Sequence, residues 1–229
     1  MSGKTQEILD QLEGLANPEA VAGMARYGIN PENTYGISIP ELRRIAKETG
    51  KDHALAGELW DSGIHEARIL ACFIADPKRV TEAQMERWAA DFDSWDVCDQ
   101  CCSSLFDKTP FAYRKAVEWS EREAEFTKRA GFTLMAALAV HDKKAGDARF
   151  EQFMPILESE STDDRNYVKK AVNWALRQIG KRNARLNRLA IEAGEKIRRI
   201  NSPAARWIAA DALRELRSAA VQKRLRERC

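Results

Sequence analysis

Hydrophobic positions recur every three or four residues along most of the chain, which is the spacing of one face of an α-helix. The clearest example lies between Arg165 and Ile179. Its apolar positions form one stripe: Val168, Ala171, Val172, Ala175, Leu176 and Ile179. No alternating run of β-branched residues bounded by hairpin turns competes with this pattern. The sequence therefore predicts an all-α protein of about a dozen helices joined by short loops.

Proline residues fall where helices are expected to start or stop, because proline is tolerated in the first helical turn but not in the interior. The four places are Asn17-Pro18, Ile39-Pro40, Thr109-Pro110 and Ser202-Pro203. Asn and Ser before a proline are also good helix caps. The segment Met24-Ala-Arg-Tyr27 ends at Gly28, which suits the residue after a helix.

A basic residue near the start of an apolar helix recurs at Arg68, Arg129, Lys170 and Arg206. The intervals are 61, 41 and 36 residues. The last two approach the period of HEAT-type helix pairs, about 40 to 47 residues. Helix pairs stacked into a curved solenoid fit this recurrence better than a four-helix bundle, and a solenoid offers a long concave surface. We therefore expect residues 1–229 to form a single domain, a HEAT-like helical-repeat solenoid.

Charge is distributed unevenly, although the net charge is only +2. From Arg165 to the end there are 18 Lys and Arg against 5 Asp and Glu, whereas the first 164 residues have 19 against 30. A basic final third on an acidic body favours a polyanionic partner such as nucleic acid. The alternative is a set of solvated helix faces.

The cysteine pattern favours reduced thiols, because the number is odd and no export signal is present. The five are Cys72, Cys98, Cys101, Cys102 and Cys229. Cys98 and Cys101 have metal-ligand spacing, but a second pair is missing and the histidines are scattered, so buried core residues are favoured over zinc. No apolar run approaches the roughly 20 residues that span a bilayer. We expect a cytoplasmic protein with no metal, cofactor or membrane partner.

The segment Asp93–Asp99 places a ring and a carboxylate, Trp95 and Asp99, four residues apart after a serine that can cap a helix. Residues four apart are neighbours on one helix face. A ring beside an acid is what a site for a planar cation needs. The alternative makes Trp95 a core residue and Asp99 a solvated neighbour. Asp96 lies 100° from Trp95 around the helix and is a poorer candidate.

Two further helices carry candidate site residues. Lys128 and Arg129 lie in the first turn of an apolar helix, where the helix dipole opposes cations. A bound anion would explain them, and so would a salt bridge to a neighbouring acid. Trp174 points away from the core stripe of its helix, on a face shared with basic residues. These residues are Lys170, Arg177 and Lys181. An aromatic ring among basic residues is typical of a nucleic-acid surface.

In the residues named above and in the segments around them, most of the chain resembles the AlkD-like family of DNA alkylation repair enzymes, which are HEAT-like-repeat alkylpurine DNA glycosylases. Four local matches carry the resemblance: Gly36-Ile-Ser-Ile-Pro-Glu-Leu-Arg43, Ser94-Trp-Asp-Val-Cys-Asp99, Lys128-Arg-Ala130 and Lys169-Lys-Ala-Val-Asn-Trp-Ala-Leu-Arg177. Ser94 departs from the family pattern, which has an aromatic residue there.

The resemblance implies that Trp95, Asp99 and Trp174 form the lesion site and that Arg129 holds the DNA backbone. It implies release of cationic N3- or N7-alkylated purines from duplex DNA by a monomer without cofactor. The residues expected to bind DNA are Tyr27, Lys128, Lys169, Lys170, Arg177, Lys181 and Arg182. The principal alternative is a non-catalytic HEAT-like module that binds damaged or branched DNA. A third interpretation is a solenoid that docks an acidic protein.

Overall fold

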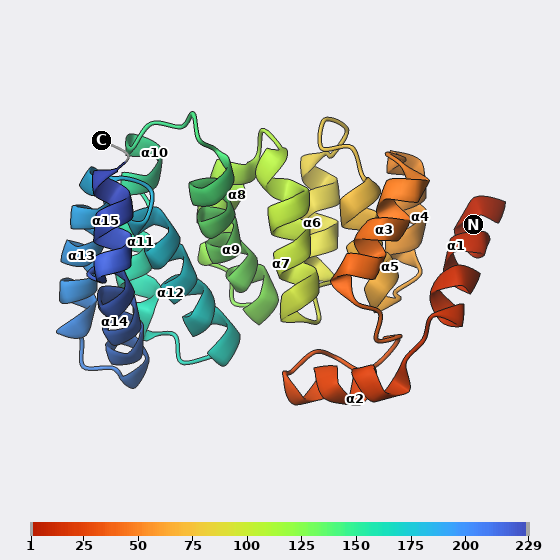
Figure 1. Cartoon of the computed structure of the whole chain (residues 1–229), viewed down its shortest axis with the longest axis horizontal. Coiled ribbons are helices and arrows are strands. Elements are labelled where there is room, and N and C mark those ends of the chain that lie inside the picture. Colours follow the sequence, from red (N-terminus) through yellow and green to blue (C-terminus); the bar gives the residue numbers. More distant parts are fainter. Residues whose placement is uncertain (1, 228–229) are drawn as a thin grey trace. The chain divides into compact units, whose positions relative to one another are not determined.

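The structure is a computed structural model that describes residues 2–227. Throughout that range the regular structure is helical, with no strand. The chain divides into two compact units, unit 1 (Met1–Thr109) and unit 2 (Pro110–Cys229), and Figure 1 labels their helices. The prediction of an all-helical fold is confirmed. A single domain over the whole chain stays a prediction.

Unit 1 consists of helices of 9 to 12 residues, and its longest loop is the segment 27–38. Its elements are α1 (Gly3–Gly14), α2 (Pro18–Arg26), α3 (Ile39–Thr49), α4 (His53–Asp61), α5 (His65–Ile74), α6 (Glu82–Ala90), α7 (Trp95–Ser104) and the 3-10 turn η1 (Phe106–Lys108). The helix α5 is the centre of this unit, because it packs against α3, α4 and α7. Beside it the rings of Trp60 and Trp88 stack with centroids 4.1 Å apart, and both side chains are buried.

The helix α2 differs from the other helices of unit 1, since it contains no buried residue. It crosses the ends of its neighbours in Figure 1 instead of lying alongside them. Gly36 makes its close approach possible: a Cβ there would stand 2.5 Å from the carbonyl oxygen of Asn17, and φ is +78°. An L side chain at Gly36 would both clash and strain the backbone.

Unit 2 combines helices of 14 to 17 residues with several shorter ones, and they are arranged in two layers. Its elements are α8 (Ala112–Ser120), α9 (Glu125–His141), α10 (Ala148–Glu151), α11 (Met154–Ser159), the 3-10 turn η2 (Glu160–Thr162), α12 (Asn166–Gly180), α13 (Ala184–Arg198), α14 (Pro203–Leu216) and α15 (Ala219–Arg226). In one layer α12 lies between α9 and α14; α8 packs on α9, and α13 packs on α11 and α14. Pairs of helices therefore stack side by side.

The apolar helix that carries Lys128 and Arg129 is α9, and every one of its residues from Arg129 to Ala139 is buried. Its contact with α8 needs Gly131, where an added Cβ would stand 2.5 Å from the backbone nitrogen of Ser120. Such a contact is too close for any side chain to accommodate without moving a helix backbone.

The recurrence read from the sequence corresponds to helices that are neighbours in unit 2. Arg129, Lys170 and Arg206 lie in α9, α12 and α14, which pack in that order. The interval of 61 residues between Arg68 and Arg129 spans one further repeat. That repeat contains α7, which begins with Trp95 and has no basic residue in its first turn. The prolines also fall as predicted: Pro18, Pro40 and Pro203 stand in the first turns of α2, α3 and α14.

Between residues 2 and 227, no helix is both long enough and apolar enough to cross a membrane.

Candidate functional site

The helix α7 presents Trp95 and Asp99 away from the core. Val97, Cys98 and Cys101 on its inner side are buried, whereas Trp95 and Asp99 are partly exposed. Because four residues make about one turn, the ring and the carboxylate are neighbours on the same face. The alternative in which Trp95 is a core residue is therefore not what the structure has.

Trp95 is fixed by the backbone of a residue 68 positions earlier. Its indole Nε1–H donates to the carbonyl oxygen of Tyr27 at 3.1 Å. Tyr27 is the C-cap of α2, and its side chain is 76% exposed. Two of the predicted site residues, Tyr27 and Trp95, are thus brought together, although the residues around Tyr27 alone indicate no function for it.

Ser94 explains how the segment after α2 is held on α7. Its hydroxyl is buried and accepts the backbone N–H of Asn30 at 2.9 Å, while the Asn30 side chain donates to Asp93 at 3.0 Å. Ser94 occupies the N-cap position of α7, but its side chain makes no cap hydrogen bond. The serine that departs from the family pattern therefore ties a loop to the site helix and does not cap it.

A buried carboxylate secures the rest of this loop. Glu66 of α5 is fully buried and accepts the backbone N–H groups of Tyr35, Gly36 and Ile37 at 2.9, 2.7 and 3.2 Å. Next to it, the His65 backbone N–H donates to Asn33 at 2.9 Å. Three donors on one carboxylate hold the loop that follows Tyr27 in a single conformation.

Asp96 is structural, in agreement with its low rank as a site candidate. It is 8% exposed, and one of its oxygens lies 2.9 Å from Nε2 of the buried His65. Burial alone would lower the pKa of His65, but the hydrogen bond and the charge of Asp96 outweigh it and raise the pKa above its usual value. The pair joins α5 to the first turn of α7.

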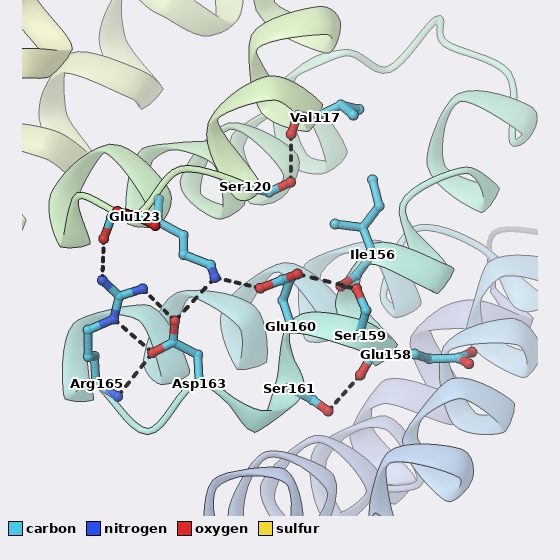
Figure 2. A network of polar contacts seen from close by, with 11 residues as sticks. Val117, Ser120, Glu123, Ile156, Glu158, Ser159, Glu160, Ser161, Asp163 and Arg165 are labelled. Atoms are coloured by element: carbon cyan, nitrogen blue, oxygen red, sulfur yellow. Dashed lines mark hydrogen bonds and ion pairs between the residues drawn. The ribbon is translucent and has the colours of Figure 1, made fainter.

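Lys128, at the start of α9, has protein partners. Its ammonium lies 2.5 Å from Glu160 and 3.3 Å from Asp163, and 13% of its side chain is exposed. Figure 2 shows the same carboxylate of Asp163 bound by Arg165, whose Nη1 also donates to the Glu123 carbonyl at 2.5 Å. Of the two explanations for a cation here, the structure has the salt bridge.

The Asp163 carboxylate is held ionised by this network. Burial acts to raise its pKa, but hydrogen bonds from the side chain and backbone of Arg165, together with Lys128, bring the pKa below the usual value. The network joins the loop before α9 to η2 and to the start of α12 (Figure 2).

Arg129 is almost fully buried, with 6% of its surface exposed. Its Nη1 donates to the carbonyl oxygen of Tyr167 at 2.7 Å. Tyr167 lies in the first turn of α12, so Arg129 fixes the beginning of the helix that carries Trp174.

Trp174 lies off the core stripe of α12, as the sequence predicted. All six residues of the stripe, Val168, Ala171, Val172, Ala175, Leu176 and Ile179, are buried, whereas Trp174 is partly exposed. Beside it, Asn173 is buried and donates to Asp211 of α14 at 3.1 Å.

The cations toward the end of α12 have partners within unit 2. Arg177 Nη1 and Lys181 Nζ lie 2.5 and 2.6 Å from the two oxygens of Glu215. Burial acts to raise the pKa of Glu215, but the hydrogen bonds from Lys181 and Arg177 hold it below the usual value. Arg182 donates to the carbonyl oxygens of Ala139 and Ala145 at 3.0 and 2.8 Å.

The start of α12 offers a more accessible basic surface. Lys170 is exposed, and the Lys169 ammonium lies over the ring of Trp207, 5.2 Å from its centroid. Trp207 is 42% exposed and was not among the predicted site residues. Its signal in the sequence was a tryptophan after Arg206 in a helix whose core positions are largely alanine, isoleucine and leucine.

The cysteines behave as core residues. Cys72, Cys98, Cys101 and Cys102 are buried and not joined in disulfides, and burial raises the pKa values of Cys101 and Cys102 well above the usual range. Cys229 lies outside the described residues. Among residues 2–227, no group of three or more His, Cys, Asp or Glu side chains is arranged to hold a metal ion.

Three comparisons place the chain among known proteins. A family model described as DNA alkylation repair enzyme matches residues 8–216. Uncharacterized protein Lin0241 from Listeria innocua is 25% identical over 195 residues, which cover 83% of this chain and 85% of that protein. A solved structure described as "A new family of proteins related to the HEAT-like repeat DNA glycosylases with affinity for branched DNA structures" has a TM-score of 0.77 at 20% identity, covering 96% of this chain and 95% of that chain.

The structural similarity confirms the predicted HEAT-like helical-repeat fold. Because the family model spans most of the sequence, the chain belongs to the DNA alkylation repair enzyme family.

Proposed function

We propose that this protein is a DNA glycosylase that hydrolyses the N-glycosidic bond of cationic N3- or N7-alkylated purines in duplex DNA. The observation that carries the proposal is the pairing of Trp95 with Asp99 on the accessible face of α7, where the Tyr27 carbonyl fixes the indole ring. Family membership supports a role in alkylation repair.

The chemistry suits a site with one carboxylate and no evident acid catalyst. An alkylated purine carries a positive charge, so it leaves with the electron pair of the C1′–N bond and becomes neutral. The sugar is left as an oxocarbenium-like cation, which water attacks at C1′ while a proton passes to a base. Asp99 would stabilise that cation and orient the water, as carboxylates do in glycoside hydrolysis.

The aromatic residues would recognise the charge of the lesion. A ring that faces a cation contributes on the order of 0.5 to 2 kcal/mol, and Trp95 and Trp174 are both accessible. Lys169 and Lys170 would neutralise backbone phosphates. Arg129 is buried and bonded to Tyr167, so we assign it a positioning role at the start of α12 in place of direct contact with the backbone.

The second candidate is a module that binds branched or damaged DNA without catalysis. It is favoured by the affinity for branched DNA of the structurally similar protein family. Both candidates involve DNA, so binding does not separate them.

Base release separates the two candidates. We expect the protein to liberate 7-methylguanine or 3-methyladenine from methylated duplex DNA, detected by chromatography of the free bases. A heat-inactivated sample of the protein controls for spontaneous loss of the labile bases. Binding to a branched junction without any base release above that background would favour the second candidate and contradict the first.

A further inference from the structure

A pocket of about 330 Å³ lies in unit 2, where the end of α9 and the α12–α13 turn meet α15. Its charged and polar lining includes Lys143, Asp147, Lys181, Arg182, Asn183 and Arg224. Four of these side chains are cationic and one is acidic. The pocket lining includes none of the residues predicted to act at the lesion or to hold the backbone beside it, namely Trp95, Asp99, Arg129 and Trp174.

The single acid in the lining is already engaged. Asp147 accepts the Asn183 amide at 2.7 Å and lies 4.0 Å from Nε of Arg185. Lys181 has its own partner in Glu215. By contrast Lys143 and Arg224 are exposed, and within residues 2–227 neither forms an ion pair with a carboxylate. The unbalanced charge of the pocket is therefore positive.

Arg182 is a cation held in place without a carboxylate. Its two Nη groups donate to the carbonyl oxygens of Ala139 and Ala145, and its guanidinium stacks over Phe150 at 4.2 Å from the ring centroid. A guanidinium has five N–H donors. Two are used by the carbonyls, so the others remain for a ligand, and little side-chain entropy is left to lose.

The turn beside Arg182 adds a second favourable feature. Asn183 caps the 15-residue helix α13 by accepting the Leu186 N–H at 2.8 Å. The positive end of the α13 dipole is thereby placed at the pocket. A fixed guanidinium, two exposed cations and a helix N-terminus together match a phosphate group and offer little to a neutral ligand.

We propose that this pocket, whose lining includes none of the residues proposed to act on the lesion, binds a backbone phosphate of DNA. The choice of DNA over a small phosphate compound rests on the proposed function. The pocket would then add affinity and register without reading sequence, as phosphate contacts do.

The test compares two double variants of the full chain. Lys143→Ser/Arg224→Ser removes the two exposed cations of the pocket and leaves the Arg182 clamp intact. The matched control is Lys144→Ser/Arg199→Ser, which removes one lysine and one arginine that are exposed but not in the lining. Affinity for an unmodified duplex is measured as a function of salt concentration. We expect the salt slope to fall by about 1 for each phosphate that the pocket variant no longer neutralises, with a clearly smaller change in the control.

Equal slopes for the two variants would overturn the proposal, because net charge alone would then explain the binding. A second arm measures thermal stabilisation by pyrophosphate. The pocket variant alone could lose this stabilisation while the salt dependence of its DNA affinity stays unchanged. That result would identify the ligand as a small phosphate compound and overturn the assignment to DNA. A pocket-specific loss of DNA affinity in a protein that releases no base would contradict the proposed function and leave the pocket assignment standing.

Discussion

The surroundings of Trp95 in unit 1 and of Trp174 in unit 2 are held together by different kinds of interaction. Around Trp95, hydrogen bonds between a loop and buried or half-buried groups fix the positions of an indole and an exposed tyrosine. Around Trp174, salt bridges between α12 and α14 engage Arg177 and Lys181, the cations that follow the ring in the sequence. Unit 1 therefore supplies a positioned ring beside a carboxylate, while unit 2 supplies a basic surface that is smaller than its composition suggests.

This difference shows that the number of basic residues along a helix overstates the positive charge that is available to a ligand. Arg177 and Lys181 share Glu215, and Lys128 shares Glu160 and Asp163. Acidic residues are few in the last third of the sequence, yet Asp211 and Glu215 lie where they pair with Arg177 and Lys181. Lys170 is left as the accessible cation nearest to Trp174 along α12.

The largest expected effect concerns the loop that follows Tyr27. Glu66→Ala leaves three backbone N–H groups without their buried acceptor, so we expect unfolding free energy to fall by about 3 kcal/mol or more. Urea unfolding at neutral pH measures it. Glu48→Ala, which removes an exposed partner of Arg44, is the matched control and should cost less than about 1 kcal/mol. Similar costs for both variants would mean that Glu66 does not organise the loop.

The next effect tests the neutralised surface of unit 2. Glu215→Gln keeps the shape of the side chain but removes the negative charge shared by Arg177 and Lys181, so both cations become available to phosphate. We expect tighter duplex binding with a salt slope steeper by about 1 to 2. Lys170→Ala should change the slope in the opposite direction by about 1.

Weaker binding by the Glu215→Gln variant would contradict this account of the α12 surface. Circular dichroism before each titration controls for loss of structure, since the ion pairs also join α12 to α14.

The smallest expected effect is a pH dependence in unit 1. The pKa of His65 is raised by Asp96, with smaller contributions from Glu66 and Asp93, against the opposing effect of burial. Its stabilising contribution is therefore fully present below the pKa of the unfolded chain, about 6.5, and is lost as pH rises through the folded pKa. The difference in unfolding free energy between wild type and Asp96→Asn should shrink between about pH 6 and pH 8. A difference that grows over this range would show that folding lowers the pKa of His65 and does not raise it.

Much of the fold could be predicted from periodicity because the long helices of unit 2 keep a continuous apolar stripe. The repeat that contains α7 was missed, since its first turn carries an acid and a tryptophan where the other repeats carry a basic residue. Ser94 was expected to cap α7 and instead binds Asn30. Local sequence favours a cap, but a loop 64 residues away supplies a competing donor.

The candidate site was predictable to the extent that it depends on helix faces. The orientations of Trp95, Asp99 and Trp174 follow from a spacing of about 100° per residue, and all three are partly exposed. The partners of Arg177 and Arg182 could not be predicted, because they come from elements 37 to 43 residues away in sequence. Such tertiary contacts decide which predicted DNA ligands remain accessible.

Asp99 is proposed to act on the sugar of a damaged nucleotide, and a single-turnover rate measures that role. The measurement is the rate constant for release of 7-methylguanine from a defined duplex, with protein in excess, for wild type, Asp99→Asn and Asp93→Asn. Asp93 is the matched control, because it is exposed and precedes the same helix. We predict a loss of at least about 100-fold for Asp99→Asn, the range of a single positioned catalytic group, and a loss below about threefold for Asp93→Asn. Release at the wild-type rate by the Asp99→Asn variant would show that the Asp99 carboxylate has no part in base release.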